Sequence, residues 1–161
     1  MTQACRSVPA DLRSWAAGSF PLGAAVELLI RAFDGRFASA RARWIVQDNP
    51  GASFWLDPDA ITPNSGVYSG GERRVLAIVQ ALATDGMWLD LGDILTGIDR
   101  RNLELVLAAM GQAAGSHQHS GLTVNTDGSP KAFTRLPSLF PWPGDDPDGD
   151  SDQDFDEEVS R

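Results

Sequence analysis

Residues 68–115 read YSGGERRVLAIVQALATDGMWLDLGDILTGIDRRNLELVLAAMGQAAG and carry the signals that decide the fold. Ser69 followed three residues later by Glu72 is the pattern of a capping box, which predicts the start of a helix. Apolar residues then recur at helical spacing. Asp99 predicts the cap of a second helix, which ends at Gly115. We expect the apolar faces of these two helices to pack on each other.

The segment between the two helices is rich in large apolar residues. We expect them to anchor this segment to the core: Trp88, Leu89, Leu91, Ile94, Leu95 and Ile98. Asp90 and Asp93 predict the cap of a short helical turn within it.

The start of this stretch resembles a known family. Residues 69–74, SGGERR, resemble the signature motif of the ABC ATPases, and residues 95–99, LTGID, fall where that family has its D-loop. In the family, the serine and glycines of the signature contact the γ-phosphate of a nucleotide held by a partner subunit. The resemblance therefore implies nucleotide contacts by Ser69, Gly70 and Gly71.

Other parts of the ABC pattern are missing from the sequence. The family's Walker B aspartate and glutamate would fall on Gly92 and Asp93, and there is no G-x-x-x-x-G-K-[ST] phosphate loop. Two interpretations of residues 69–74 stay open. They belong either to a degenerate nucleotide-binding fragment that acts with a partner ATPase, or to a capping box whose glycines let the helix begin close to a neighbour.

A second resemblance covers the same stretch. Small actinobacterial proteins, chromosomal or phage-borne, carry SGGER followed by L-x-L-x-D-x-L-T-G-x-D-x-x-N, and this chain is similar to them in both segments. The resemblance implies an actinobacterial or phage origin and no particular mechanism.

Acidic residues are concentrated at the C-terminal end of the chain, which has 161 residues and a net charge of −9. Residues 145–161 contain nine Asp or Glu and one Arg, whereas residues 1–144 contain thirteen acids and twelve bases. The folded part is therefore near neutral, and this argues against direct binding to nucleic acid. The length suits one domain with its own core.

Cys5 is the only cysteine, so no disulfide can form within the chain, and this favours a cytosolic setting. The N-terminus lacks the charged start and apolar segment of a secretory signal, and no apolar run approaches the length of about 18 residues that a spanning helix needs. We expect a cytoplasmic protein without a membrane partner.

We expect residues 1–19 to form an irregular N-terminal arm, because they show little periodicity and include Pro9 and Gly18. The globular domain is predicted over residues 20–136, with a helix over residues 22–33.

Within this domain, residues 36–43 have the composition of a further helix, with a mildly basic patch of Arg36, Arg41 and Arg43. Residues 44–47 and 53–56, joined by the turn sequence D-N-P-G, predict a β-hairpin that packs on the helices.

His117 and His119 are the only histidines, and one residue separates them. On an extended segment both imidazoles would reach one metal ion. Two alternatives stay open: a metal-dependent hydrolase at these histidines, or a polar loop at a helix end, where histidines complement the helix dipole. The residues that follow, 122–124 and 132–136, predict a second hairpin.

Residues 137–144 form a proline-punctuated strap with Leu139, Phe140 and Trp142 as apolar anchors, either on the home domain or on a partner. Residues 145–161 are too acidic and too poor in apolar residues to fold alone, which predicts a disordered tail.

Three interpretations of the tail stay open. It is a solvating terminus, an interaction segment, or a calcium loop, because its acids fall at the spacing of an EF-hand loop although Ser151 replaces the turn glycine. In the interaction segment, the predicted partner contacts are Phe140, Trp142, Asp154, Phe155 and Asp156.

The pattern argues against an enzyme, since the sequence has no G-x-S-x-G elbow and Asp90 and Asp93 are better explained as caps. We expect a compact, mainly helical α+β domain with short hairpins and no cofactor. The leading functional hypothesis is a small adaptor or inhibitor-like protein that binds another protein through a helical face and its acidic aromatic tail.

Overall fold

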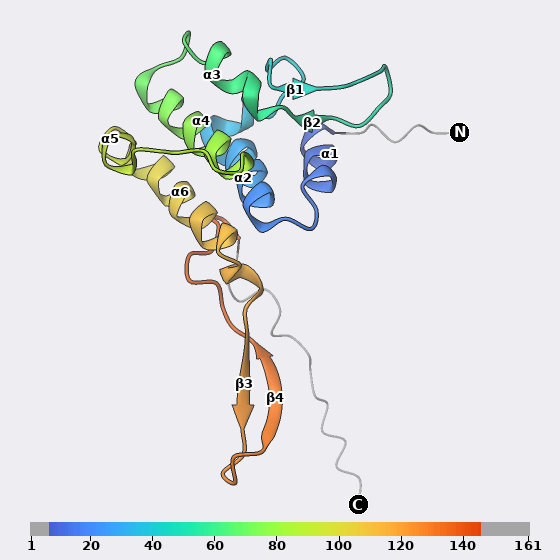
Figure 1. Ribbon diagram of the computed structural model, residues 1–161, viewed down its shortest axis with the longest axis vertical. Coiled ribbons are helices and arrows are strands. Elements are labelled where there is room, and N and C mark those ends of the chain that lie inside the picture. Colours follow the sequence, from blue (N-terminus) through green and yellow to red (C-terminus); the bar gives the residue numbers. More distant parts are fainter. Residues whose placement is uncertain (1–6, 146–161) are drawn as a thin grey trace, which may run out of the picture.

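The computed structural model describes residues 7–145 and shows six α-helices and two small antiparallel sheets in that range (Figure 1). The helices are α1 (Val8–Trp15), α2 (Phe20–Arg31), α3 (Ile61–Asn64), α4 (Gly70–Ala83), α5 (Leu91–Leu95) and α6 (Arg100–Ala113). Short 3-10 turns are η1 (Ala32–Gly35), η2 (Pro58–Ala60) and η3 (Ser116–Gln118). The strands are β1 (Ile45–Val46), β2 (Trp55–Leu56), β3 (Ser120–Val124) and β4 (Pro130–Arg135). The predicted fold class, mainly helical α+β with short hairpins, is confirmed.

Helix α2 is the central element of the core. The Ser19 hydroxyl accepts a hydrogen bond from the Leu22 N–H at 3.3 Å, and Pro21 lies in the first turn, where its missing N–H is not needed. Its buried side chains include Ala24 and Ala25, which are small enough to let neighbours approach closely. Helices α4 and α6 each pack mainly on α2 and contact each other much less. The expectation that these two helices pack chiefly on each other is therefore wrong.

The helix caps predicted in residues 68–115 are confirmed. The Ser69 hydroxyl accepts from the Glu72 N–H at 3.4 Å, and the Glu72 carboxylate accepts from the Ser69 N–H at 2.8 Å. At the start of α6, the Asp99 carboxylate accepts from the backbone N–H of Asn102 at 3.0 Å and from its amide at 2.6 Å. These two bonds lower the pKa of Asp99. Gly115, with φ 79°, follows the end of α6.

The segment between α4 and α6 differs from its prediction at two residues. The side chains of Trp88 and Leu91 are 95% and 46% exposed, so they do not anchor the segment to the core. Leu89 packs against the core and Ile94 is buried, as predicted. Asp90 caps α5 by accepting from the Asp93 N–H at 3.1 Å, which also confirms the prediction.

Residues 8–15 form helix α1, where the sequence suggested an irregular arm over residues 1–19. The Ser7 hydroxyl caps this helix, and Pro9 lies in its first turn, where proline is tolerated. Leu12 is fully buried in the core, so α1 belongs to the globular domain.

Residues 36–43 form turns rather than the expected helix. Phe33 and Asp34 adopt left-handed φ values of 50° and 57°, which redirect the chain after α2. The buried side chain of Trp44 then donates to the Phe37 carbonyl at 2.9 Å. Burial of these aromatic side chains overrides the helical composition of the segment.

The basic patch expected in this segment is partly neutralised. The Arg36 guanidinium pairs with the Glu72 carboxylate and lies over the rings of Phe37, at 4.8 Å, and Tyr68, at 5.7 Å. Arg36 therefore ties this segment to the start of α4 instead of presenting a free cation.

Both predicted hairpins are confirmed. In the first, Ile45 lies opposite Leu56 and Val46 opposite Trp55, and Leu56 is fully buried. The second, made of β3 and β4, projects away from the helical body (Figure 1). None of its strand residues is buried.

Candidate interaction surface

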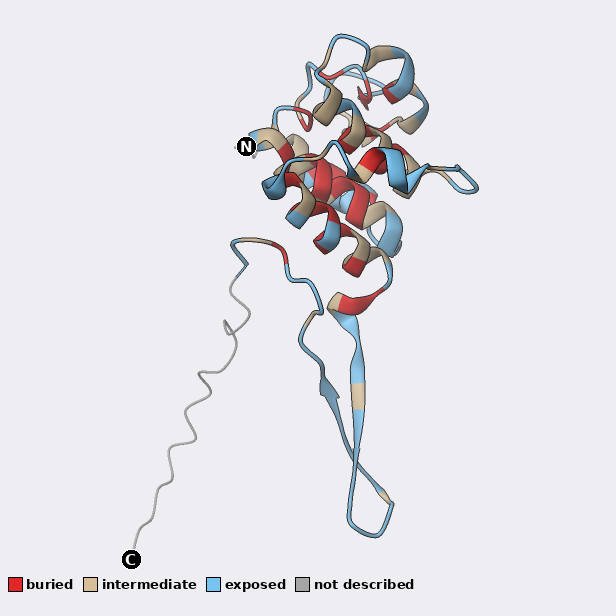
Figure 2. Ribbon diagram, turned by 90° about the vertical axis from the view of Figure 1, so that its left-hand side faces the viewer, coloured by how far each residue is buried: buried red, intermediate tan, exposed pale blue. Residues whose placement is uncertain are grey.

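The β3–β4 hairpin is largely exposed along both strands (Figure 2) and carries large apolar side chains on one of its faces. Leu122 lies directly opposite Phe133, and opposed residues share a face of the sheet. Val124 lies two residues after Leu122 and is therefore on the same face. The side chains of Leu122, Val124 and Phe133 are 49%, 57% and 80% exposed. We call these three residues the hairpin face.

Exposed apolar side chains are concentrated around this hairpin. Within residues 7–145, six of the thirteen large exposed hydrophobic residues fall between positions 120 and 140, and this density sets the segment apart from the helical body. They are Leu122, Val124, Phe133, Leu136, Leu139 and Phe140. Single exposed apolar residues are ordinary, whereas the three that share the hairpin face indicate a binding surface.

The turn of the hairpin is held by its own polar groups. The Asn125 N–H donates to the Ser129 carbonyl at 2.8 Å, and Gly128 has φ 81°. The Asp127 carboxylate accepts from the Ser129 hydroxyl at 2.6 Å and from its N–H at 2.9 Å. These bonds lower the pKa of Asp127 and close the turn, next to a shift in strand register between Thr123 and Val124.

The base of the hairpin is attached to the end of α6 through η3. The Leu136 N–H donates to the His119 carbonyl at 2.9 Å, and the Arg135 guanidinium donates to the His117 carbonyl at 2.9 Å. A β carbon at Gly121 would lie 3.1 Å from the Leu136 side chain, so Leu136 covers this glycine. These contacts set the direction in which the hairpin leaves the body.

The strap over residues 137–144 packs on its own domain through Trp142. The indole is 4% exposed, its N–H donates to the Gln112 side-chain oxygen at 2.6 Å, and its ring lies 5.0 Å from the Arg31 guanidinium. Burial leaves Trp142 no surface for the partner contact predicted for it. Phe140, which is 49% exposed beside Gly111, retains such a surface.

Three further contacts hold the strap. The Leu139 N–H donates to the Ser116 hydroxyl at 2.9 Å, and the Ser138 hydroxyl lies 3.3 Å from Nδ1 of His117. At the end of the strap, the Arg31 guanidinium donates to both carboxylate oxygens of Asp145 at 3.1 Å. The predicted contacts Asp154, Phe155 and Asp156 lie outside the residues that the structure describes.

Arg31 also belongs to a charged network on α2. Burial alone would raise the pKa of Glu27, but hydrogen bonds from Arg13, at 2.5 Å, and from Arg31, at 3.1 Å, outweigh it and lower that pKa. The same pairing raises the pKa of Arg13. The network links α1, α2 and the strap.

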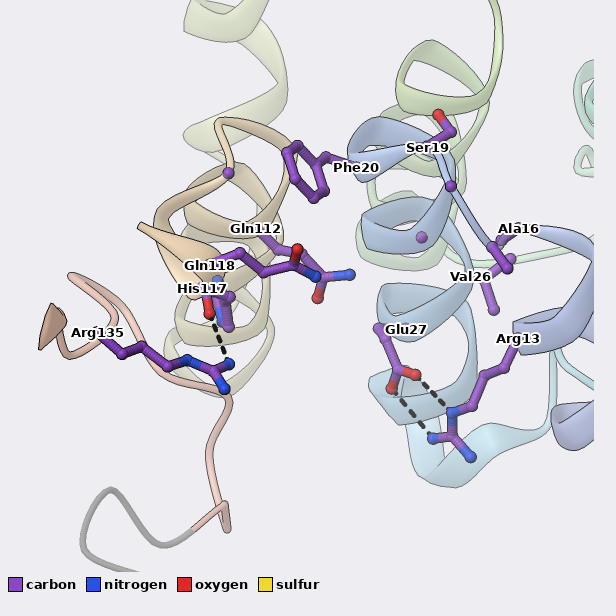
Figure 3. A pocket seen from close by; sticks show the side chains of 14 residues that line it. Arg13, Ala16, Ser19, Phe20, Val26, Glu27, Gln112, His117, Gln118 and Arg135 are labelled. Atoms are coloured by element: carbon purple, nitrogen blue, oxygen red, sulfur yellow. Dashed lines mark hydrogen bonds and ion pairs between the residues drawn. The ribbon is translucent and has the colours of Figure 1, made fainter. Parts of the chain in front are cut away.

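A groove of about 700 Å³ lies between the α1–α2 connection and the end of α6 (Figure 3). Arg13 and Glu27 lie on one side, and the amide of Gln118 and the guanidinium of Arg135 lie on the other. Its polar groups are mostly engaged with each other, since Arg13 bonds Glu27 and Arg135 bonds a carbonyl. The groove offers shape and polarity.

The two histidines are placed differently from the metal prediction. His117 lies in the 3-10 turn η3, and burial lowers its pKa. His119 follows in an extended conformation and is exposed. Within residues 7–145, no group of three His, Cys, Asp or Glu side chains could hold a metal ion. Among the described residues, therefore, no third ligand lies beside the pair.

The residues that resemble the ABC signature make structural contacts here. The Ser69 hydroxyl is engaged in the capping box, and a β carbon at Gly71 would lie 3.6 Å from the Gly97 carbonyl oxygen. The Arg74 guanidinium lies across Gly97, so closely that a β carbon there would overlap it, and donates to the Asp93 carbonyl at 3.4 Å. The start of α4 thus packs on the turn before α6, while nucleotide contact stays a prediction.

Comparison with models of protein families, with curated proteins and with solved structures found no match for this chain. Among the helices within residues 7–145, none combines the length and the apolar character that crossing a membrane would require.

Sequence reasoning located the second hairpin but missed its role as an exposed surface. The signal was the alternation of Leu122 and Val124 with polar residues, which predicts one apolar face. Alternation does not say whether such a face packs on the body or projects from it.

Proposed function

We propose that the chain is a small protein-interaction protein, adaptor or inhibitor-like, that binds another protein through the hairpin face. The observation that carries this proposal is the exposure of Leu122, Val124 and Phe133 on one side of a hairpin that projects from the body. Full burial of such a side chain contributes about 1.5–3 kcal/mol. The helical faces named in the sequence hypothesis are less suited, because α4 and α6 bury theirs on α2.

The marginal stability of a two-stranded hairpin is a second argument for a partner. An isolated two-stranded hairpin is marginally stable in water, and additional strands or a packed helix are what normally stabilise it. A partner surface that covers the hairpin face supplies that packing. Binding and ordering of the hairpin are thereby coupled.

The charges beside the hairpin face indicate the chemistry of the partner. Lys131 and Arg135 are exposed on β4. An apolar groove with an acidic rim would match both the ring of Phe133 and these cations.

The acidic tail provides a second proposed contact. Arg31 fixes Asp145, the last residue that the structure describes, at the end of the strap. Asp154, Phe155 and Asp156 are proposed to contact a basic part of the same partner. A cytosolic setting, supported by the single cysteine, and an actinobacterial or phage origin remain part of this proposal.

Affinity capture from a host lysate, followed by quantitative mass spectrometry, tests the proposal. The baits are the full chain, Phe133→Ser and Trp88→Ser. Both variants remove an exposed aromatic ring and leave the core intact, so they are matched. We expect a partner that both the full chain and Trp88→Ser capture, and that Phe133→Ser captures about tenfold less.

Loss of the partner with Trp88→Ser alone would place the surface on the α4–α5 loop and contradict the proposal. A chain that stops at Gly144 measures the contribution of the tail. If this shorter chain loses the partner while Phe133→Ser keeps it, the tail is the main contact and the hairpin face is not.

A further inference from the structure

The two edges of the β3–β4 sheet differ in how they are protected. Natural edge strands are guarded by proline and by charged side chains, which discourage pairing with another chain. β4 carries Pro130, Lys131 and Arg135, whereas β3, from Ser120 to Val124, contains neither a charge nor a proline. Within residues 7–145, β3 pairs only with β4. Its outer edge is therefore open to another strand.

The hydrogen bond between the Leu136 N–H and the His119 carbonyl fixes which backbone groups lie on that edge. In an antiparallel pair, hydrogen-bonded and non-hydrogen-bonded positions alternate. The backbone groups of residues 119, 121 and 123 therefore face β4. Those of Ser120, Leu122 and Val124 point away from it and are available for a further strand.

We infer that β3 pairs antiparallel with β3 of a second copy of this chain, which joins the two hairpins into one four-stranded sheet. In this register Leu122 faces the second copy's Leu122, and Ser120 faces the second copy's Val124. All three are outward-facing positions, so their N–H and carbonyl groups meet in hydrogen-bonded pairs.

A second copy fits this edge because a two-fold interface brings each residue near its own counterpart. Charged side chains near the axis would face their own sign, and β3 has none between residues 120 and 124. The alternative edge is less suitable, since the pairing of β4 is irregular at Lys131 and an axis at Phe133 would bring Lys131 towards the second copy's Arg135. Like charges directly opposed destabilise a strand pair.

The four-stranded sheet is also expected to be more stable than the single hairpin, because sheets of three or more strands are stable where two-stranded sheets are marginal. The edge uses backbone groups, whereas the hairpin face uses side chains. Pairing through β3 leaves Phe133 free and brings the hairpin faces of two copies onto one side of the sheet. This dimer goes beyond the proposed function and does not depend on it.

Cysteine cross-linking tests the register. In a Cys5→Ala background, Leu122→Cys places two thiols on Cα atoms about 5.5 Å apart, within the reach of a disulfide. Phe133→Cys places them on the two outer strands, about 14 Å apart, from three strand spacings. We expect mild oxidation to cross-link the first variant and not the second. Cross-linking at position 133 instead would show face-to-face packing and overturn the inference.

Sedimentation equilibrium of the full chain tests the edge itself, at concentrations up to about 1 mM because the interface is small. We expect the wild type and Leu122→Ala to approach twice the monomer mass. Leu122→Pro, which lacks an outward N–H but spares the bonds to β4, stays monomeric. Ser120→Pro is a second edge variant, with circular dichroism as the check on folding.

A wild type that is monomeric at the highest concentration, or proline variants that still dimerise, would overturn the inference. Phe133→Ser separates it from the proposed function. If both proposals hold, Phe133→Ser still dimerises but no longer captures the partner. If the wild type dimerises and captures no partner, the pairing of β3 is supported and the proposed function is not.

Discussion

The indole N–H of Trp142 donates to the side-chain oxygen of Gln112 at 2.6 Å, across thirty residues of sequence. This bond closes the segment that contains η3 and the hairpin into a loop whose two ends meet at α6. The strap is therefore a structural part of the domain, and the hairpin between its ends is held at a fixed base.

Replacing Trp142 by alanine tests this closure. The side chain is 4% exposed and lies against Arg31, so Trp142→Ala should lower the free energy of unfolding by about 3–5 kcal/mol. Urea denaturation followed by circular dichroism measures it. Leu139→Ala, at a residue 76% exposed, is the control and should change it by less than about 0.5 kcal/mol. Equal effects of the two variants would show that the strap is not packed.

We expect His117 to make the stability of the domain depend on pH. Burial lowers the pKa of His117 below its ordinary 6.5, against the opposing effect of Asp145. Because the folded pKa is the lower one, the unfolded state takes up the proton first as pH falls. The contribution of neutral His117 to the free energy of unfolding is complete above about pH 6.5. It is lost as the pH falls through 6.5 toward the pKa of the folded state.

Denaturation midpoints between about pH 7.5 and pH 5.5 measure this loss. We expect it in the wild type and in His119→Gln, and a smaller dependence in His117→Gln. An unchanged pH dependence in His117→Gln would assign the effect to other groups.

The capping box of α4 gives a third prediction. Ser69→Ala removes the acceptor of the Glu72 N–H and should cost about 1 kcal/mol of unfolding free energy. Thr126→Ala, in the exposed hairpin turn, is the control and should be neutral. Thermal unfolding compares the two. An unchanged unfolding temperature in Ser69→Ala would contradict a stabilising role of the Ser69 cap.

Trp88 and Trp44 should behave oppositely in fluorescence quenching. Trp88 is 95% exposed and Trp44 is 1% exposed. Trp88→Ser should remove much of the emission that iodide quenches and change the unfolding free energy by less than about 0.5 kcal/mol. Trp44→Phe should leave that quenching unchanged and cost about 2 kcal/mol, because the Phe37 carbonyl loses its buried donor. Quenching that survives in Trp88→Ser would place this ring in a protected setting.

Local signals in the sequence were sufficient to predict structure where a side chain hydrogen-bonds to backbone groups a few residues away. Ser69 with Glu72, and Asp99 with Asn102, are contacts over three residues, and the structure contains both. The hairpin turn at residues 125–129 is of the same kind. These predictions hold because no distant part of the chain is needed to decide them.

Predictions that depended on distant partners were less successful. The periodicity of residues 75–83 marks an apolar face but cannot say that α2 covers it. Pro9 favours an irregular segment when it is considered alone, but the Ser7 cap places it in the first turn of α1, where proline is tolerated. Trp88 and Trp142 are both predicted from the sequence as apolar anchors, yet one is exposed and the other is buried. The candidate surface was missed for the same reason, since exposure is a property of the whole fold.

The position of Arg74 across Gly97 has an evolutionary consequence. A β carbon at position 97 would overlap the guanidinium, so a larger residue at 97 displaces the end of the Arg74 side chain from this turn. Related chains that keep Arg74 across the turn should therefore keep Gly97, whereas a shorter side chain at 74 leaves position 97 free to vary. Correlated variation at these two sites would therefore identify distant relatives by shared packing, even where they have lost the serine and glycines that make the segment resemble a nucleotide-binding signature.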